Sequence, residues 1–182
     1  MFNLRYIDNI YLEINILEYA DITDLDDILK LDPNYYPYIR TIKSDKKEID
    51  IELFKKYNFK RLRKLILPKN RNITDNGLKY LFTTLSRTLQ ELDLYHNKNI
   101  TDNGLKYLST ILLDNLPKVV SLLKLDLSWS MNITDNGLKY LFTPLTINIQ
   151  KLYLNSNTNI TDNGLKYLPE NLQELYLYSN NK

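Results

Sequence analysis

The sequence predicts an α/β solenoid, in which a curved parallel sheet carries helices on its convex side. Two repeated patterns support this fold class. The segment NITDNGLKYL occurs four times without a substitution, at residues 72–81, 99–108, 132–141 and 159–168, so that successive copies start 27, 33 and 27 residues apart. The pattern L-x-x-L-x-L-x-x-N precedes each copy and occurs a fifth time at residues 172–180. A segment repeated at nearly even spacing indicates a building unit, because an active site is assembled from unlike residues.

The L-x-x-L-x-L-x-x-N segments predict the strands. Their alternating apolar residues have the period of two that a short strand with one buried face requires. We expect parallel strands near residues 62–70, 89–97, 122–130, 149–157 and 172–180, with centres at Leu65, Leu92, Leu125, Leu152 and Leu175.

The repeated decapeptide predicts the start of a helix. In the first copy, Leu78, Leu81, Phe82 and Leu85 recur at the spacing of one helix face. The threonine of each copy is a suitable N-cap, and the aspartate after it places negative charge at the positive end of the helix dipole. The expected helix starts are Asp75, Asp102, Asp135 and Asp162. The 33-residue unit is expected to carry its six extra residues around 112–121.

All four glycines occupy one repeat position: Gly77, Gly104, Gly137 and Gly164. Glycine lowers helix propensity, so a glycine in a first helical turn needs a reason. Either each backbone approaches its neighbour closely, or recent duplications copied one glycine. The sequence leaves both explanations open.

Together these motifs resemble the cysteine-containing subclass of leucine-rich repeats, common in F-box proteins that recruit substrates to ubiquitin ligases. The resemblance covers about residues 60–180. It implies that the residue after each strand hydrogen-bonds backbone groups of the turn and forms a ladder along the solenoid. Asparagine, which donates and accepts, suits that role better than serine. This chain has asparagine where the subclass often has cysteine, except in the third unit: Asn70, Asn97, Ser130, Asn157 and Asn180.

Residues between the inward leucines are expected to point out of the concave face. Aromatic side chains on a rigid, exposed surface are frequent anchors of protein interfaces. We therefore predict a protein-binding surface centred on Trp129. Its residues are Asp93, Tyr95, His96, Asp126, Trp129, Tyr153, Tyr176 and Tyr178. The competing interpretation is that tyrosine is abundant in this chain and strands favour aromatic residues regardless of function.

Residues 1–58 lack the repeat and form a separate predicted region, mainly helical. They hold 12 acidic and 8 basic residues, whereas residues 59–182 hold 10 and 16. One interpretation is a cap over the first hydrophobic unit. The other is an F-box, because residues 16–39 resemble the latter part of that motif, although its Leu-Pro opening is absent. The resemblance implies that six residues bind a Skp-type adaptor: Ile16, Leu17, Leu25, Ile28, Leu31 and Tyr35.

Catalysis has few candidate residues. A chain with no cysteine and one histidine has neither a thiol nucleophile nor a His-pair zinc motif. The four glycines form no phosphate-binding loop. We expect no enzyme activity, no cofactor and no metal. The carboxylates of Asp93 and Asp126, aligned on neighbouring strands, are more simply explained as solvated charges than as an acid–base pair.

The remaining predictions concern location and partners. The sequence shows no signal peptide, no membrane span and no basic cluster dense enough for nucleic acid. A cytoplasmic protein is expected. The abundance of Ile, Asn, Lys and Tyr suggests an AT-rich genome such as that of a giant virus, in which case the location is the host cytoplasm.

Two functions fit this sequence. One is a partner-binding module, in the sharper form the substrate-recruiting subunit of a Skp/cullin-type ubiquitin ligase; the other is a structural or inhibitory scaffold unrelated to ubiquitin. The last strand has an open edge through which copies are expected to associate.

Overall fold

The computed structural model describes residues 28–49, 54, 57, 59, 61–85, 88–110, 122–143 and 148–180. Within them, the strands form one parallel sheet whose order follows the sequence. The strands are Thr41–Lys43 (β1), Lys64–Ile66 (β2), Glu91–Asp93 (β3), Lys124–Asp126 (β4), Lys151–Tyr153 (β5) and Glu174–Tyr176 (β6). In this part of the chain the sheet is accompanied by the α-helices Asp75–Leu85 (α4), Asp102–Thr110 (α5), Asp135–Phe142 (α6) and Asp162–Leu165 (α7), and a 3-10 helix spans Pro33–Tyr38 (η2).

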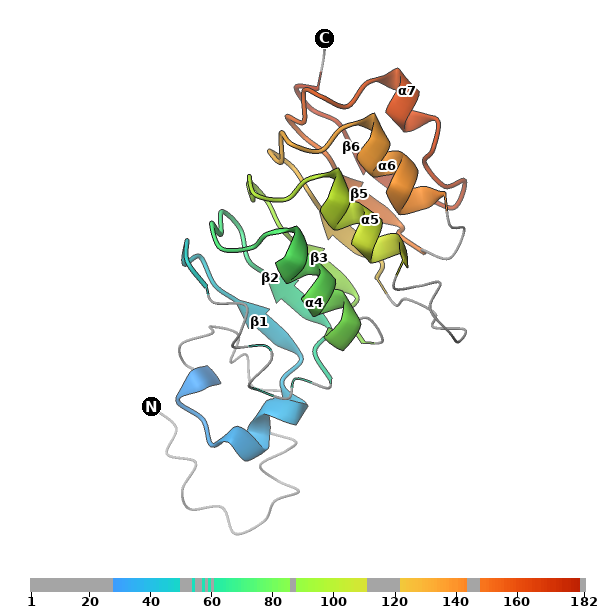
Figure 1. Cartoon of the computed structure of the whole chain (residues 1–182). Coiled ribbons are helices and arrows are strands. Elements are labelled where there is room, and N and C mark those ends of the chain that lie inside the picture. The colour runs from blue at the N-terminus through green and yellow to red at the C-terminus, as the bar shows by residue number, and fades with distance from the viewer. Residues whose placement is uncertain are drawn as a thin grey trace.

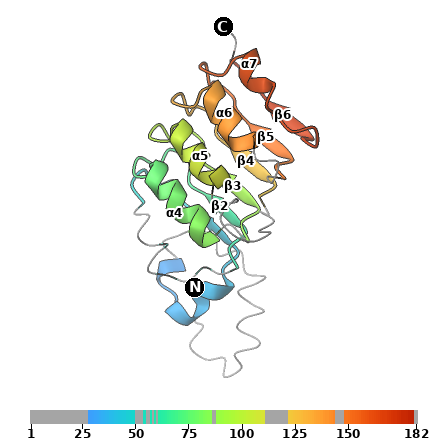
Figure 2. The same ribbon diagram turned by 45° about the vertical axis from the view of Figure 1, so that its right-hand side comes forward.

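The helices stack in one row and the strands in another, as Figures 1 and 2 show from two directions. The predicted fold class is confirmed. Each predicted strand centre is the middle residue of a strand, and each helix begins at its predicted aspartate. The segment expected to hold the six extra residues, 112–121, lies outside the described residues.

Inward leucines form the core between the two rows. The central leucines of β2 to β6 are aligned in register from strand to strand. Those of β2 to β5 are buried, whereas Leu175 of β6, at the end of the described sheet, is 36% exposed. Each unit therefore depends on its neighbour to cover its apolar face.

Strand β1 was not predicted, because residues 1–58 were expected to be mainly helical. It pairs with β2, placing Ile42 opposite Leu65. Ile39, Ile42 and Ser44 occupy the three inward positions of the strand pattern, and all three are buried. A serine at the third position and a lysine, Lys47, in place of the asparagine hid this degenerate unit from the pattern.

The convex side is held together by a carboxylate at the start of α4, α5 and α6. Asp75 accepts hydrogen bonds from the backbone N–H (2.8 Å) and the hydroxyl (2.7 Å) of Thr101 in the next unit. Asp102 does the same for Thr134, and Asp135 for Thr161. Each threonine in turn caps its own helix by accepting from a backbone N–H. The predicted caps are thus confirmed, and the aspartate has a second role that the sequence did not suggest.

The contact of each aspartate with the threonine of the next unit, which we call the clamp, explains three of the glycines. A Cβ atom added to Gly104 would lie 2.6 Å from Oδ1 of Asp75 and 3.0 Å from Cδ1 of Leu78. Gly137 and Gly164 meet the aspartates of the preceding units in the same way. Close approach between units is therefore sufficient to account for the glycine at these positions.

Separately from the aspartate–threonine contacts, a ladder of hydrogen bonds runs through the turns that follow the strands. The Nδ2 group of Asn157 donates to the carbonyl of Leu127 (2.9 Å), and its Oδ1 accepts from the backbone N–H of Ser130 (2.7 Å). Asn180 makes the corresponding bonds to Leu154 and to Asn157. The hydrogen-bond ladder implied by the family resemblance is therefore present.

Ser130 interrupts this ladder. Its hydroxyl is buried and has no hydrogen-bond partner, and the same is true of Oδ1 of Asn97 in the preceding unit; these are the two such atoms among the described residues. Serine is too short to reach the neighbouring backbone as Asn157 does. A buried polar atom without a partner lowers stability.

We expect Ser130→Asn to stabilise the protein. The longer side chain can donate to the carbonyl of Leu94 and accept from the backbone N–H of Asn97, which repeats the bonds of Asn157. Two new buried hydrogen bonds should raise the free energy of unfolding by about 1 kcal/mol after the cost of fitting a larger side chain. Urea denaturation measures the change.

Asn157→Ser is the reverse substitution and should lower the free energy of unfolding by about 1–3 kcal/mol, because it removes the two buried hydrogen bonds of the Asn157 side chain. A Ser130→Asn variant that is less stable than the parent protein would show that the site cannot accommodate the asparagine.

Candidate functional site

The concave face is the side of the sheet away from the helices. Its residues flank the central leucine of each strand, and those of β3 to β5 are neither fully buried nor fully exposed. In the turn after each strand from β2 to β6, one residue has a left-handed backbone conformation. These residues are Lys69, His96, Trp129, Ser156 and Ser179, with φ between 57° and 61°. The turns with His96 and Trp129 form the rim of the concave face.

The structure brings together the residues predicted at the centre of the binding surface. The rings of His96 and Trp129 are stacked, with centroids 5.7 Å apart and planes 8° from parallel, and the Tyr95 ring lies 5.9 Å from that of His96. Trp129 is 38% exposed. A bulky side chain in the left-handed region costs roughly 1 kcal/mol or more. Trp129 is therefore not the residue that folding alone would favour at this turn.

A second aromatic group lies on β5 and β6. The rings of Tyr153 and Tyr176 stack with centroids 4.3 Å apart and planes 3° from parallel. The ammonium of Lys124 lies 5.4 Å from the centroid of Tyr153. Tyr178 follows in the turn after β6 and is 81% exposed. The predicted residues thus form two aromatic groups, one at the rim and one at the end of the described sheet.

The two predicted carboxylates lie between these groups. Asp93 and Asp126 are opposite each other in the register of β3 and β4. Each accepts a hydrogen bond from a backbone N–H two residues later, of Tyr95 and Ser128 respectively. Burial, and secondarily the charge of Asp126, raises the pKa of the Asp93 carboxyl. A raised pKa means that the stability contributed by protonated Asp93 is present at low pH and is lost as the pH rises through the folded-state value.

A charged column on the same face was missed by the sequence analysis. Glu91 bridges Lys124 (2.6 Å) and Lys64 (3.3 Å), and Lys151 pairs with Glu174. Burial raises the pKa of the Glu91 carboxyl, but the bonds and charges of Lys124 and Lys64 outweigh it, so the pKa lies below its ordinary value. The side chains of Lys64, Glu91, Lys124 and Lys151 line a groove of about 340 Å³ beside Tyr153. They stand two places before the residues that were predicted, so strand alternation could have identified them.

The predicted adaptor-binding residues are only partly described. Ile16, Leu17 and Leu25 lie outside the described residues. Ile28 is buried in the core, and Leu31 is half-buried and packs against it. Tyr35 is half-buried in the 3-10 helix η2. In this structure Ile28 and Leu31 contribute to packing at the start of the solenoid.

In the described part of the chain, no group of three or more His, Cys, Asp or Glu side chains could hold a metal ion. No helix there is long and apolar enough to cross a membrane.

Comparison with known proteins supports the fold. The family described as "Leucine Rich repeat" matches residues 85–109, 120–142 and 147–168. The tropomodulin C-terminal domain of Caenorhabditis elegans is similar over 88% of this chain and 89% of its own, with a TM-score of 0.50 and 14% identity. A chain of the yeast Rad7 and Elc1 complex is similar over 86% of this chain and 48% of its own, with a TM-score of 0.46 and 16% identity. No curated protein sequence matches. The fold is that of a leucine-rich-repeat solenoid, and proteins with these repeats generally bind other proteins.

We expect copies of the protein to associate through β6 as the concentration rises. This strand pairs with β5 and has no other partner among the described residues, and it exposes Tyr176 and Tyr178. An unpaired strand with exposed aromatic residues can pair with another chain. Sedimentation of the 182-residue protein over a range of concentrations measures this association.

Tyr178→Lys should keep the protein monomeric, because a charge on the edge opposes pairing. Met131→Lys introduces the same charge at an exposed apolar residue away from β6 and should leave the association unchanged. A parent protein that stays monomeric at high concentration would contradict the prediction.

Proposed function

We propose that this protein is a scaffold that holds a protein partner on its concave face. The observation that carries the proposal is the presence of two stacked aromatic groups, around Trp129 and around Tyr153, on a rigid sheet. Interface anchors are enriched in tryptophan and tyrosine, and a few of them supply most of the binding energy. Because the rings are already stacked in the free protein, binding needs little ordering of these side chains.

The charged column supports the same proposal. Glu91, Lys124 and Lys151 place both signs of charge beside the aromatic groups, along the groove next to Tyr153. An arrangement of anchors flanked by charges favours a partner with a complementary pattern and disfavours others. The partner fitting this face has an apolar or aromatic segment with charged residues at its borders.

The finer proposal is that residues 16–39 join the scaffold to a Skp-type adaptor of a cullin-type ubiquitin ligase. It rests on the resemblance of those residues to the latter part of an F-box. In that arrangement the concave face selects the substrate and the N-terminal region connects it to the ligase. The alternative, a structural or inhibitory scaffold with no ubiquitin connection, requires the concave face alone.

Substitution of the anchors should weaken partner binding without unfolding the protein. Partners are first isolated with the intact protein and identified, and each purified partner is then titrated against variants. Trp129→Asn and Tyr153→Ala should each weaken binding by about 2 kcal/mol or more. Asparagine is chosen for Trp129 because it tolerates the left-handed backbone of that turn, so stability should be equal or higher.

Tyr167→Ala is the matched control, since Tyr167 lies on the convex side and is as exposed as Trp129. Leu125→Ala serves as the structural comparison and should lower the free energy of unfolding by about 2–5 kcal/mol, because it removes a buried side chain. Partner binding that is unaffected by Trp129→Asn and Tyr153→Ala would rule out the concave face.

The adaptor proposal has a separate test. The purified protein is mixed with a purified Skp-type adaptor, and Leu17→Ala combined with Leu25→Ala should abolish their association while binding of the concave-face partner survives. These leucines lie at the motif positions expected to contact the adaptor. If the parent protein does not bind the adaptor, the ubiquitin connection is lost and the scaffold alternative remains.

A further inference from the structure

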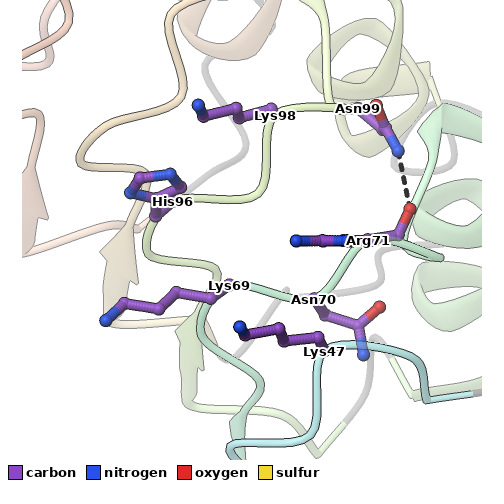
Figure 3. Close-up of a pocket in the computed structure, with 7 residues that line it drawn as sticks. All are labelled: Lys47, Lys69, Asn70, Arg71, His96, Lys98 and Asn99. Carbon is purple, nitrogen blue, oxygen red and sulfur yellow. Dashed lines mark hydrogen bonds between the residues drawn. The ribbon is translucent and has the colours of Figure 1, made fainter.

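A strongly basic pocket lies where the turns after β1, β2 and β3 meet. Its volume is about 520 Å³, and its lining consists of five basic side chains and two asparagines, with no carboxylate. The basic residues are Lys47, Lys69, Arg71, His96 and Lys98. In Figure 3 the side chains of Lys47, Lys69, Arg71 and Lys98 extend from these turns in the same direction. We call this feature the basic pocket.

The cations of the basic pocket are not neutralised by any carboxylate in the part of the chain that the structure describes. Lys47, Lys69, Arg71 and Lys98 form no ion pair with a carboxylate in the described part of the chain, whereas the strand lysines Lys64, Lys124 and Lys151 all do. The ammonium of Lys69 lies 5.8 Å from the ring centroid of Tyr95, which does not remove its charge. Four cations around one concavity repel one another, and a bound anion would relieve that repulsion.

His96 responds to this positive potential. Burial lowers the pKa of its imidazole, and the charges of Lys98 and Lys69 lower it further. In the described part of the chain, the rings of Tyr95 and Trp129 also lie against His96. The imidazole is therefore biased towards its neutral form as long as no anion is bound.

The backbone around the pocket is fixed by side-chain amides. Oδ1 of Asn70 accepts from the backbone N–H groups of Asn72 (2.8 Å) and Ile73 (3.1 Å). Nδ2 of Asn99 donates to the carbonyl of Arg71 (2.6 Å), as Figure 3 shows. The turns that carry the cations are thus tied to one another, so a ligand meets a preformed arrangement.

We propose that the basic pocket binds a phosphate monoester group on a phosphorylated segment of the protein held by the concave face. A phosphate monoester carries up to two negative charges and three strong acceptor oxygens, and the planar guanidinium of Arg71 can bind two of those oxygens at once. The lysines add point charges around it. This inference rests on the proposed function for the source of the phosphate, and the stack of His96 on Trp129 joins the pocket to the aromatic anchors.

The distribution of charge favours one phosphorylated position over a nucleic acid. In the next two units, the turn position of His96 is occupied by Trp129 and Ser156, and that of Lys98 by Met131 and Thr158. The basic column therefore ends after the third turn. A nucleic-acid strand needs cations along its length to release many counterions, whereas a single phosphate needs one cluster.

The test uses the full protein and three probes: a phosphoserine peptide with otherwise neutral residues, the same peptide with serine, and inorganic phosphate. The chain has one tryptophan and one histidine. Trp129 fluorescence and the NMR signal of His96 therefore report on the pocket without ambiguity. The phosphopeptide should bind at least about tenfold more tightly than its serine twin, because charge-assisted hydrogen bonds are lost with the phosphate. At saturation the pKa of His96 should rise, because a bound anion stabilises the imidazolium.

Arg71→Gln combined with Lys98→Gln should weaken phosphopeptide binding at least about tenfold. The matched control is Lys139→Gln combined with Lys166→Gln, which removes the same charge on the convex side and should leave binding unchanged. Lys47→Gln, a single exposed substitution, is expected to weaken binding in the same direction and tests the pocket if the double variant unfolds.

Three outcomes overturn the proposal. The serine peptide binding as tightly as the phosphopeptide would remove phosphate recognition, as would binding that none of the pocket substitutions affects. Inorganic phosphate binding as tightly as the phosphopeptide would assign the pocket to a free anion. These results are separable from failure of the concave-face proposal, because Trp129→Asn should weaken capture of the partner while leaving the pocket's cations and its phosphate binding in place.

Discussion

The rest of the solenoid depends on one contact between units. In it, the aspartate that begins α4, α5 or α6 accepts hydrogen bonds from the threonine of the next unit. Asp102 binds the backbone N–H and hydroxyl of Thr134, and this holds the start of the next helix close enough that only glycine fits at position 137. The threonine that receives the clamp also caps its own helix. The same few atoms therefore start one helix and fix its distance from the previous one. A shift there would separate the leucine layers and expose core that has no other cover.

The clamp also explains why ten residues recur without a change. In the last three decapeptides the first asparagine donates to a carbonyl of the previous unit, as Asn132 does to Lys98. The lysine lies over the tyrosine ring of the next unit, as Lys106 does over Tyr140 at 5.6 Å. Isoleucine is buried in the core of every unit, and both leucines are buried in α4, α5 and α6. Because most positions must match the same residue in the neighbouring unit, a substitution in one copy affects two interfaces. Stacking therefore favours identical residues at these positions.

The repeat made the strands and helices of the solenoid predictable from the sequence. Features without a repeated pattern, such as β1 and the basic pocket, were not predictable. Strand centres such as Leu92 and helix starts such as Asp102 follow from local periodicity, which survives in a single sequence. Strand β1 was missed because Ser44 replaces an inward leucine, so its packing depends on β2 rather than on its own pattern. The aromatic stack of His96 and Trp129 could be anticipated from aligned columns. The basic pocket could not, since Lys47, Arg71 and Lys98 lie more than 20 residues apart and each is unremarkable alone.

The side chains on the concave face and its rim differ from unit to unit, whereas the residues that stack the units do not. The turn position with left-handed backbone occurs after β2 to β6, yet it carries lysine, histidine, tryptophan and serine in succession. The solenoid fixes where each side chain stands, and its identity is then free to differ from unit to unit. Positive charge is concentrated in the first three turns, exposed apolar and aromatic side chains follow at Trp129 and Met131, and stacked tyrosines lie beyond them on β5 and β6. A partner that lies across the strands meets these chemistries in a fixed order. Its direction on the face is therefore specified by the order of the units as well as by any single contact.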